Sequence, residues 1–148
     1  MASRHGRPVG GGIVWPSAKM VYALRASALL ARAYPGRRLK AADMARQGKV
    51  PLQFLSRILG DLREGGLVDA RRGYHGGYVL KRDPSDITVA ELAQAVDGHG
   101  LFVPVPRHRR NPPLAFVDDL RCRLDDVARE AFEATSIAEI KAGLGTSL

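Results

Sequence analysis

Cysteine is almost absent from this chain: among 148 residues there is one, Cys122. A single cysteine excludes an intrachain disulfide and any metal site built from this chain's cysteines alone. No apolar run approaches the roughly 18 to 20 residues that a membrane-spanning helix needs, and the first residues lack the apolar core of a signal peptide. These absences predict a protein without a membrane partner, at home in the reducing cytoplasm.

The residue constellations of enzymes are also missing. The sequence offers no paired carboxylates in a plausible pocket, no Ser/His/Asp set and no Cys/His arrangement, and neither common glycine-rich phosphate loop occurs. His75, His99 and His108 lack ligand spacing within one element, and isolated histidines in loops are usually solvated. We therefore expect no catalytic residues and no metal site.

Acidic residues are scarce in the first half of the chain. Residues 14–82 carry 14 Lys and Arg against 4 Asp and Glu, whereas residues 83–148 carry 7 against 11; the whole chain has a formal charge of +8. A basic surface suits a polyanion, because neutralising phosphates releases their counterions. We predict that the first half of the chain binds double-stranded DNA and that the acidic second half has a different role.

Three helices are predicted before residue 65. Ser17 is a suitable N-cap for a helix that ends at Pro35-Gly36. A short helix over residues 40–47 breaks at Gly48, and Pro51 suits the first turn of the next helix, where its missing N–H is not needed. Helix, tight turn and helix at this spacing are typical of a helix-turn-helix.

The third helix has an apolar stripe that fixes its outer face. The stripe recurs at i, i+3, i+4 and i+7, in Leu55, Ile58, Leu59 and Leu62. At about 100° per residue, the opposite face carries Gln53, Ser56, Arg57 and Gly60. Glutamine can bond to adenine, arginine can grip guanine, and glycine allows a close backbone approach. We predict major-groove contacts here; ordinary solvated polar positions are the alternative.

A glycine-rich hairpin follows the third helix. Gly65-Gly66 ends the helix, and two short strands are predicted from Leu67 and from Tyr78. The tip between them carries Arg71, Arg72 and three glycines. Arginine on a thin hairpin can enter a minor groove and sense its negative potential. This hairpin is the predicted wing, unless its arginines are merely solvated.

Four ordered motifs lie in the first two thirds of the chain: SAKMVYALRA (17–26), AADMA to LREGGLV (41–68), RRGYHGGYVLKR (71–82) and DITVAELAQAVDG (86–98). Together they resemble the Rrf-two family of winged-helix transcription regulators, which includes IscR, NsrR and CymR. The resemblance implies a homodimer on a pseudo-palindromic operator, with Arg72 as the wing arginine in the minor groove. Tyr74-His75 stand where the family commonly has small residues.

Residues 99–113 are rich in Pro, Arg and His, which predicts an irregular linker or sensing loop. In the cluster-binding members of the resembling family this loop holds three closely spaced cysteines, whereas here it has none. The resemblance therefore implies that the chain holds no iron-sulfur cluster, and we expect no other cofactor. A small-molecule effector or an oxidant remains open as the signal.

From Leu114 to about Thr135 a helical pattern carries a heptad seam. The seam residues are Val117, Leu120, Leu124, Val127 and Ala131. A helix of roughly 30 Å extends beyond a small core and needs a partner. The resemblance implies the dimerisation helix, with ordinary core packing as the alternative. Cys122 lies off the seam, and we expect a buried or inert thiol rather than a redox switch.

Thr88 with Glu91 and Ser136 with Glu139 have the spacing of capping boxes, which predict the starts of two short helices. These observations predict a mainly α fold with a small β-wing: a winged helix-turn-helix followed by a long C-terminal dimerisation helix. The expected parts are a disordered tail (1–13), a DNA-binding domain (14–98), the linker (99–113), and the dimerisation and last helices (114–148). The predicted function is that of a sequence-specific transcriptional regulator, most simply a repressor. A winged-helix module that binds a protein instead of DNA is the rival.

Overall fold

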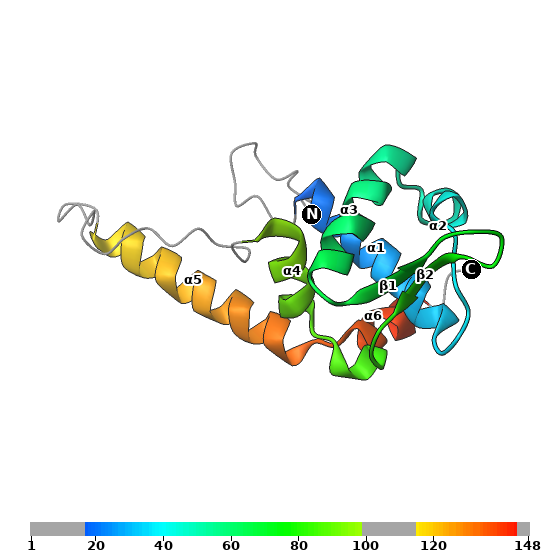
Figure 1. Cartoon of the computed structure of the whole chain (residues 1–148). Helices are drawn as coiled ribbons and strands as arrows, with labels where there is room; N and C mark the ends of the chain where they lie inside the picture. Colours follow the sequence, from blue (N-terminus) through cyan, green and yellow to red (C-terminus); the bar gives the residue numbers. More distant parts are fainter. Residues whose placement is uncertain (1–16, 99–114, 145–148) are drawn as a thin grey trace, which may run out of the picture.

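The computed structural model describes residues 17–98 and 115–144. Figure 1 shows a helical body, a two-stranded hairpin on one side of it, and one long helix that projects away from the body. The predicted tail and linker lie outside the described residues, as do His99 and His108. The mainly α fold with a small β-wing is confirmed.

The first three helices form as the sequence predicts, with small shifts at their ends. Helix α1 spans Ala18–Ala33, and the Ser17 hydroxyl caps it by accepting the Met20 N–H at 3.1 Å. Helix α2 spans Ala41–Gly48 and helix α3 spans Leu52–Glu64. Pro51 is the N-cap of α3 and not part of its first turn, since its ψ of 130° is extended. The helix-turn-helix is thus present.

Helix α1 runs through the middle of the body and packs on α2, α3, α4 and α6. The predicted apolar stripe of α3 is fully buried against it, which confirms the inner face of that helix. Burying these leucine and isoleucine side chains stabilises the fold by about 1.5 to 3 kcal/mol each. The orientation of α3 is therefore fixed by the core, and its outer face is free.

The wing consists of β1 (Val68–Arg71) and β2 (Gly77–Leu80), which pair antiparallel with Val68 opposite Leu80. A third, one-residue partner joins them: Leu39, just before α2, exchanges two backbone hydrogen bonds with Tyr78, at 2.8 and 2.9 Å. No local sequence pattern predicted this pairing. It attaches the wing directly to the segment between α1 and α2.

The second half of the chain begins with a 3₁₀ turn, η1 (Pro84–Asp86), and helix α4 (Val89–Asp97). The predicted capping box of α4 is present: the Thr88 hydroxyl accepts the Glu91 N–H, and the Glu91 carboxylate accepts the Thr88 N–H. Its C-cap, Gly98, is left-handed at φ 70°. Both ends of α4 are thus capped by hydrogen bonds to neighbouring residues.

Helix α5 spans Ala115–Ala134 and helix α6 spans Ile137–Leu144. A second predicted capping box, between Ser136 and Glu139, is also confirmed. Ile137 is fully buried, and its N–H donates to the Ile87 carbonyl at 2.9 Å. In Figure 1 the chain therefore runs along α5 from its outer end back to the body, where α6 is anchored to the core. Among the described residues no helix meets the length and apolarity of a membrane span.

Candidate nucleic-acid interface

The outer face of α3 carries the predicted major-groove side chains. Gln53, Ser56 and Arg57 are all exposed, on the side of the helix opposite its buried stripe. Gly60 continues this face, and a Cβ added there would meet no heavy atom within 4 Å. The structure thus brings the three predicted side chains together on one open surface. Their donors and acceptors match base edges and phosphates.

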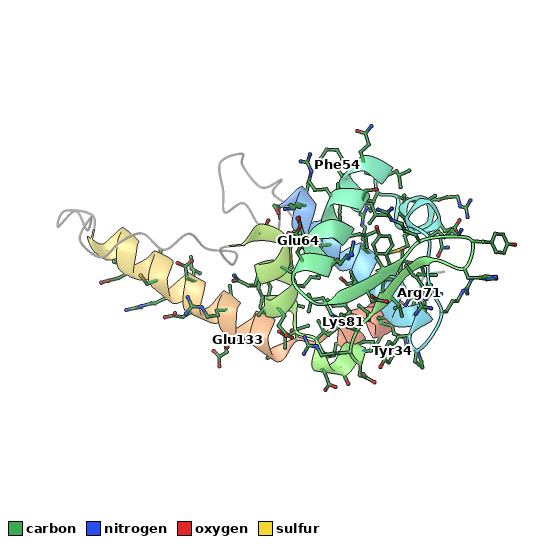
Figure 2. The ribbon with its side chains drawn as sticks, viewed as in Figure 1. Tyr34, Phe54, Glu64, Arg71, Lys81 and Glu133 are labelled. Carbon is green, nitrogen blue, oxygen red and sulfur yellow. The ribbon has the colours of Figure 1, made fainter. Side chains whose placement is uncertain are left out.

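Two apolar residues on α3 were missed by the sequence reasoning. Phe54 is 57% exposed and Leu52 is 47% exposed, although both belong to the helix that packs on the core. Figure 2 shows Phe54 at the outer end of α3, and its ring lies 6.4 Å from that of Tyr22 on α1. Exposed apolar groups beside a polar reading face suit the methyl group of thymine. Their positions in the sequence could have predicted this exposure, because both lie on α3 outside the stripe of buried residues.

The wing tip is held in a tight turn by its glycines. The Gly76 N–H donates to the Gly73 carbonyl at 3.0 Å, and a Cβ on Gly76 would lie 2.2 Å from the carbonyl oxygen of Arg71. Only glycine fits there. Arg71 and Arg72 are both exposed at this end of the hairpin (Figure 2 labels Arg71). The predicted minor-groove side chains are therefore open to solvent.

Tyr74 projects from the wing tip with 87% of its surface exposed. The ammonium of Lys40 lies 5.7 Å from the centre of its ring, and the His75 ring meets it edge-on at 4.9 Å. A lysine over an aromatic face is attracted by the ring quadrupole. The Tyr74-His75 pair, where the sequence departs from the resembling family, thus makes a broad aromatic tip.

Arg38 anchors the wing, a role that sequence reasoning missed. Its guanidinium donates to the Asp69 carboxylate at 2.6 Å and to the Gly77 carbonyl at 3.2 Å, and only 17% of its side chain is exposed. The hydrogen bond from Arg38 lowers the pKa of Asp69 and outweighs the opposing effect of burial. Arg38 therefore ties both strands to the segment before α2.

A half-buried ion pair joins α3 to its neighbours. The Lys19 ammonium on α1 lies 2.9 Å from an Asp61 carboxylate oxygen on α3, and it also donates to the Val96 carbonyl on α4. Removing one partner would leave the other charge partly buried and unpaired. This contact connects α1, α3 and α4 on the side away from the exposed polar face of α3.

The predicted seam of α5 lies on the exposed side of the projecting helix. Leu120, Leu124 and Val127 are 47%, 46% and 65% exposed, and Ala131 is exposed as well. Val117 lies on the same helix, but its side chain is outside the described residues. Packing against the core, which was the alternative prediction for this helix, is seen at Phe132, a neighbour of the seam that is half-buried against the core.

Cys122 was expected to be buried or inert, and burial is wrong: the residue is exposed on α5. That its thiol is inert stays a prediction. Cysteine is often buried, but Cys122 lies on a helix that projects from the body, where little packs around it. Within residues 17–98 and 115–144, no three His, Cys, Asp or Glu side chains gather in a way that could hold a metal ion.

A helix-turn-helix with an open polar face, followed by an arginine-bearing hairpin, defines the class of winged-helix DNA-binding proteins. Comparison with protein families is more specific. Residues 16–140 match the model of the Rrf2 family, described as iron-dependent transcriptional regulators. The chain belongs to the Rrf2 family, and the fold and relatives are those of transcriptional regulators, not of enzymes.

Relatives in two bacteria agree with this assignment. An rrf2-like HTH-type transcriptional regulator of Rhodobacter capsulatus is 37% identical over 122 residues, covering 77% of this chain and 79% of that protein. The HTH-type regulator Rv1287 of Mycobacterium tuberculosis is 43% identical over 82 residues, 55% of this chain and 51% of that protein. The chain thus matches about half the length of this second relative.

Solved structures show the same architecture. CymR, the global cysteine regulator of B. subtilis, superposes with a TM-score of 0.73 at 25% identity, covering 85% of this chain and 95% of CymR. The IscR of T. potens has a TM-score of 0.70 at 22% identity, covering 86% of each chain. The arrangement of the winged helix and the long helix is therefore shared.

Proposed function

We propose that this protein is a homodimeric, sequence-specific transcriptional repressor that binds a pseudo-palindromic operator. The observation that carries the proposal is the open polar face of α3, held over a fully buried stripe and next to an arginine-bearing wing. A protein of this kind acts on DNA in the cytoplasm. An unidentified small-molecule effector would set its affinity for DNA.

In this proposal α3 reads the major groove. Arg57 can donate two hydrogen bonds to guanine and Gln53 can bond to adenine, each such pair contributing about 1 to 3 kcal/mol of discrimination. Ser56 bonds to a phosphate or a base. Phe54 adds an apolar contact beside them, which would favour thymine.

The wing reads the adjacent minor groove. Arg72 is the main contact and Arg71 supports it, because a narrow minor groove concentrates negative potential and attracts guanidinium groups. The aromatic tip at Tyr74 limits how deeply the hairpin enters. Recognition by the wing then depends on groove shape more than on base identity.

The second copy of the chain covers the exposed seam of α5. Isolated apolar side chains are common on protein surfaces, but Leu120, Leu124 and Val127 form one stripe on a helix that leaves the body. A two-fold axis through paired α5 helices gives two reading helices. Their spacing on DNA is then about 34 Å or a multiple of it.

We propose that this member of the family works without an iron-sulfur cluster. The family description names iron, yet the chain has one cysteine, and that cysteine is exposed on α5. Iron-sulfur clusters are held mainly by several cysteine thiolates. The residues of this chain do not fit such a group, and no step of the function passes through it.

The central test is selection of bound sequences from a random pool of double-stranded DNA by the full-length protein. We expect a two-fold symmetric site, and a reporter gene placed behind it should be repressed. Arg57→Ala should relax base preference at one position of each half-site, while Arg72→Ala should weaken binding where the minor groove is narrow. Lys141→Gln, on α6, is the matched control.

Two results would count against the proposal. Retention of no DNA at any salt concentration, together with salt-insensitive binding of another protein, would favour the interaction module. A selected site without symmetry, bound by a monomer in sedimentation, would refute the dimer while leaving the reading face in place.

A further inference from the structure

A basic groove lies between the wing tip and the start of α2. Its volume is about 570 Å³, and its walls come from residues 36–40 on one side and from Arg71 and residues 74–76 on the other. Four cationic side chains line it: Arg37, Arg38, Lys40 and Arg71. The groove is polar, and it is separate from the face of α3.

The charges of the groove are not neutralised from within. Asp43 on the same wall is paired with Arg46 at 2.9 Å, and Arg38 is paired with Asp69. Among the described residues no carboxylate forms an ion pair with Arg37, Lys40 or Arg71. The groove therefore presents three positive charges to an external anion.

The place of the groove between α3 and the wing indicates which anion would bind in it. In Figure 1, α2 lies between α3 and the far end of the β-hairpin, and the groove is bounded by α2 and that end. The major and minor grooves of B-DNA are separated by a sugar-phosphate backbone. If α3 occupies the major groove and the wing the adjacent minor groove, that backbone must cross the surface between them.

We infer that this groove binds the phosphodiester backbone that separates the two DNA grooves, with Arg37 and Lys40 as its main contacts. The inference rests on the proposed function and adds residues to its interface. The ring of Tyr74 forms an apolar wall for the sugar and keeps the Lys40 ammonium at the groove. These contacts position the protein on DNA and carry no base information.

The first test measures operator affinity across a series of salt concentrations for Arg37→Gln and Lys40→Gln. Each change should weaken binding roughly 3- to 10-fold at low salt and make the log-log salt slope less steep by about 1.8, because each of the two protomers loses one phosphate contact of about 0.9. Base preference in the selected site should stay unchanged. Lys141→Gln, which removes an exposed charge from α6, should alter neither quantity.

A second test identifies the phosphate itself. Neutral methylphosphonate linkages are placed one at a time along the strand between the two contacted grooves. In the wild-type complex one position should weaken binding, and the Arg37→Gln/Lys40→Gln double variant should be insensitive to that replacement. Full additivity at every position would overturn the inference, because the two side chains would then not contact a phosphate.

A free anion is the other source of the same chemistry. Inorganic phosphate is titrated against the DNA-free protein at constant ionic strength, with amide shifts of residues 37–40 and 71–76 as the signal. Saturable binding that Lys40→Gln abolishes, with DNA affinity unaltered in that variant, would assign the groove to an effector and overturn the inference.

Failure of the inference differs from failure of the function. If Arg57→Ala and Arg72→Ala weaken operator binding while Arg37→Gln and Lys40→Gln match the control, the groove is not part of the interface and the regulator remains. If wild-type protein selects no DNA site, the proposed function itself is wrong.

Discussion

Gly77→Ala is the substitution that best tests how the wing is attached. Gly77 has φ 128°, and a Cβ there would lie 2.6 Å from the Leu39 carbonyl oxygen and 2.9 Å from its carbon. Both atoms are backbone, so the new methyl group cannot be accommodated by a side-chain rotation. The Leu39 segment has to move away from β2.

The magnitude follows from what that movement breaks. Two backbone hydrogen bonds between Leu39 and Tyr78 are lost, each contributing about 0.5 to 1.5 kcal/mol. A non-glycine residue held at positive φ adds about 1 to 2 kcal/mol. We expect the wing attachment to lose about 3 kcal/mol, which is roughly a hundredfold faster exchange of the Tyr78 amide hydrogen.

Amide hydrogen exchange measures this locally, and Gly73→Ala is the control. Gly73 also has a positive φ, 100°, but a Cβ there would meet nothing within 4 Å. The control therefore isolates the backbone term from the clash with Leu39. Equal acceleration of the Tyr78 amide in both variants would refute the clash, and DNA binding in Gly77→Ala should lose the contribution of the wing.

Three further predictions follow from the structure. Lys49 sits at φ 51° at the end of α2, so Lys49→Gly should raise the free energy of unfolding by up to about 1 kcal/mol in urea titration. Because Arg38 lowers the pKa of Asp69, the contribution of this pair should be complete above the ordinary aspartate pKa of 3.8 and be lost as the pH falls below it; a carboxyl NMR titration checks this, and Arg38→Met should raise the pKa of Asp69 toward its ordinary value. Ile137→Ala should destabilise the body by about 2 to 5 kcal/mol in thermal unfolding, although it lies beyond the projecting helix.

Local patterns predicted the elements and one face of the site. The stripe from Leu55 to Leu62 fixed which side of α3 is buried, and this in turn placed Gln53, Ser56 and Arg57 on the exposed side. Capping boxes at Thr88 and Ser136 were legible because all their members lie within four residues. The ends of the helices and the starts of the two strands shifted by one or two residues.

Features that depend on distant residues were not predictable. Arg38 bonds to Asp69, 31 residues away, and to Gly77, 39 residues away. The basic groove likewise joins the segment before α2 to the wing tip. No periodicity in a single sequence reports such contacts, because they arise only when the tertiary fold brings two segments together. The exposure of Cys122 had the same origin.

The position of α6 in the core implies that the protein can be divided into two separate peptides. Since Ile137 and its neighbours are seated in the core by packing and by backbone hydrogen bonds, the last two helices do not depend on a covalent link to α4 for their place. Separate peptides covering residues 1–98 and 115–148 should reassemble when mixed. Such a split regulator would bind DNA only in cells that make both pieces, so the C-terminal helices become a part of the protein that can be supplied separately.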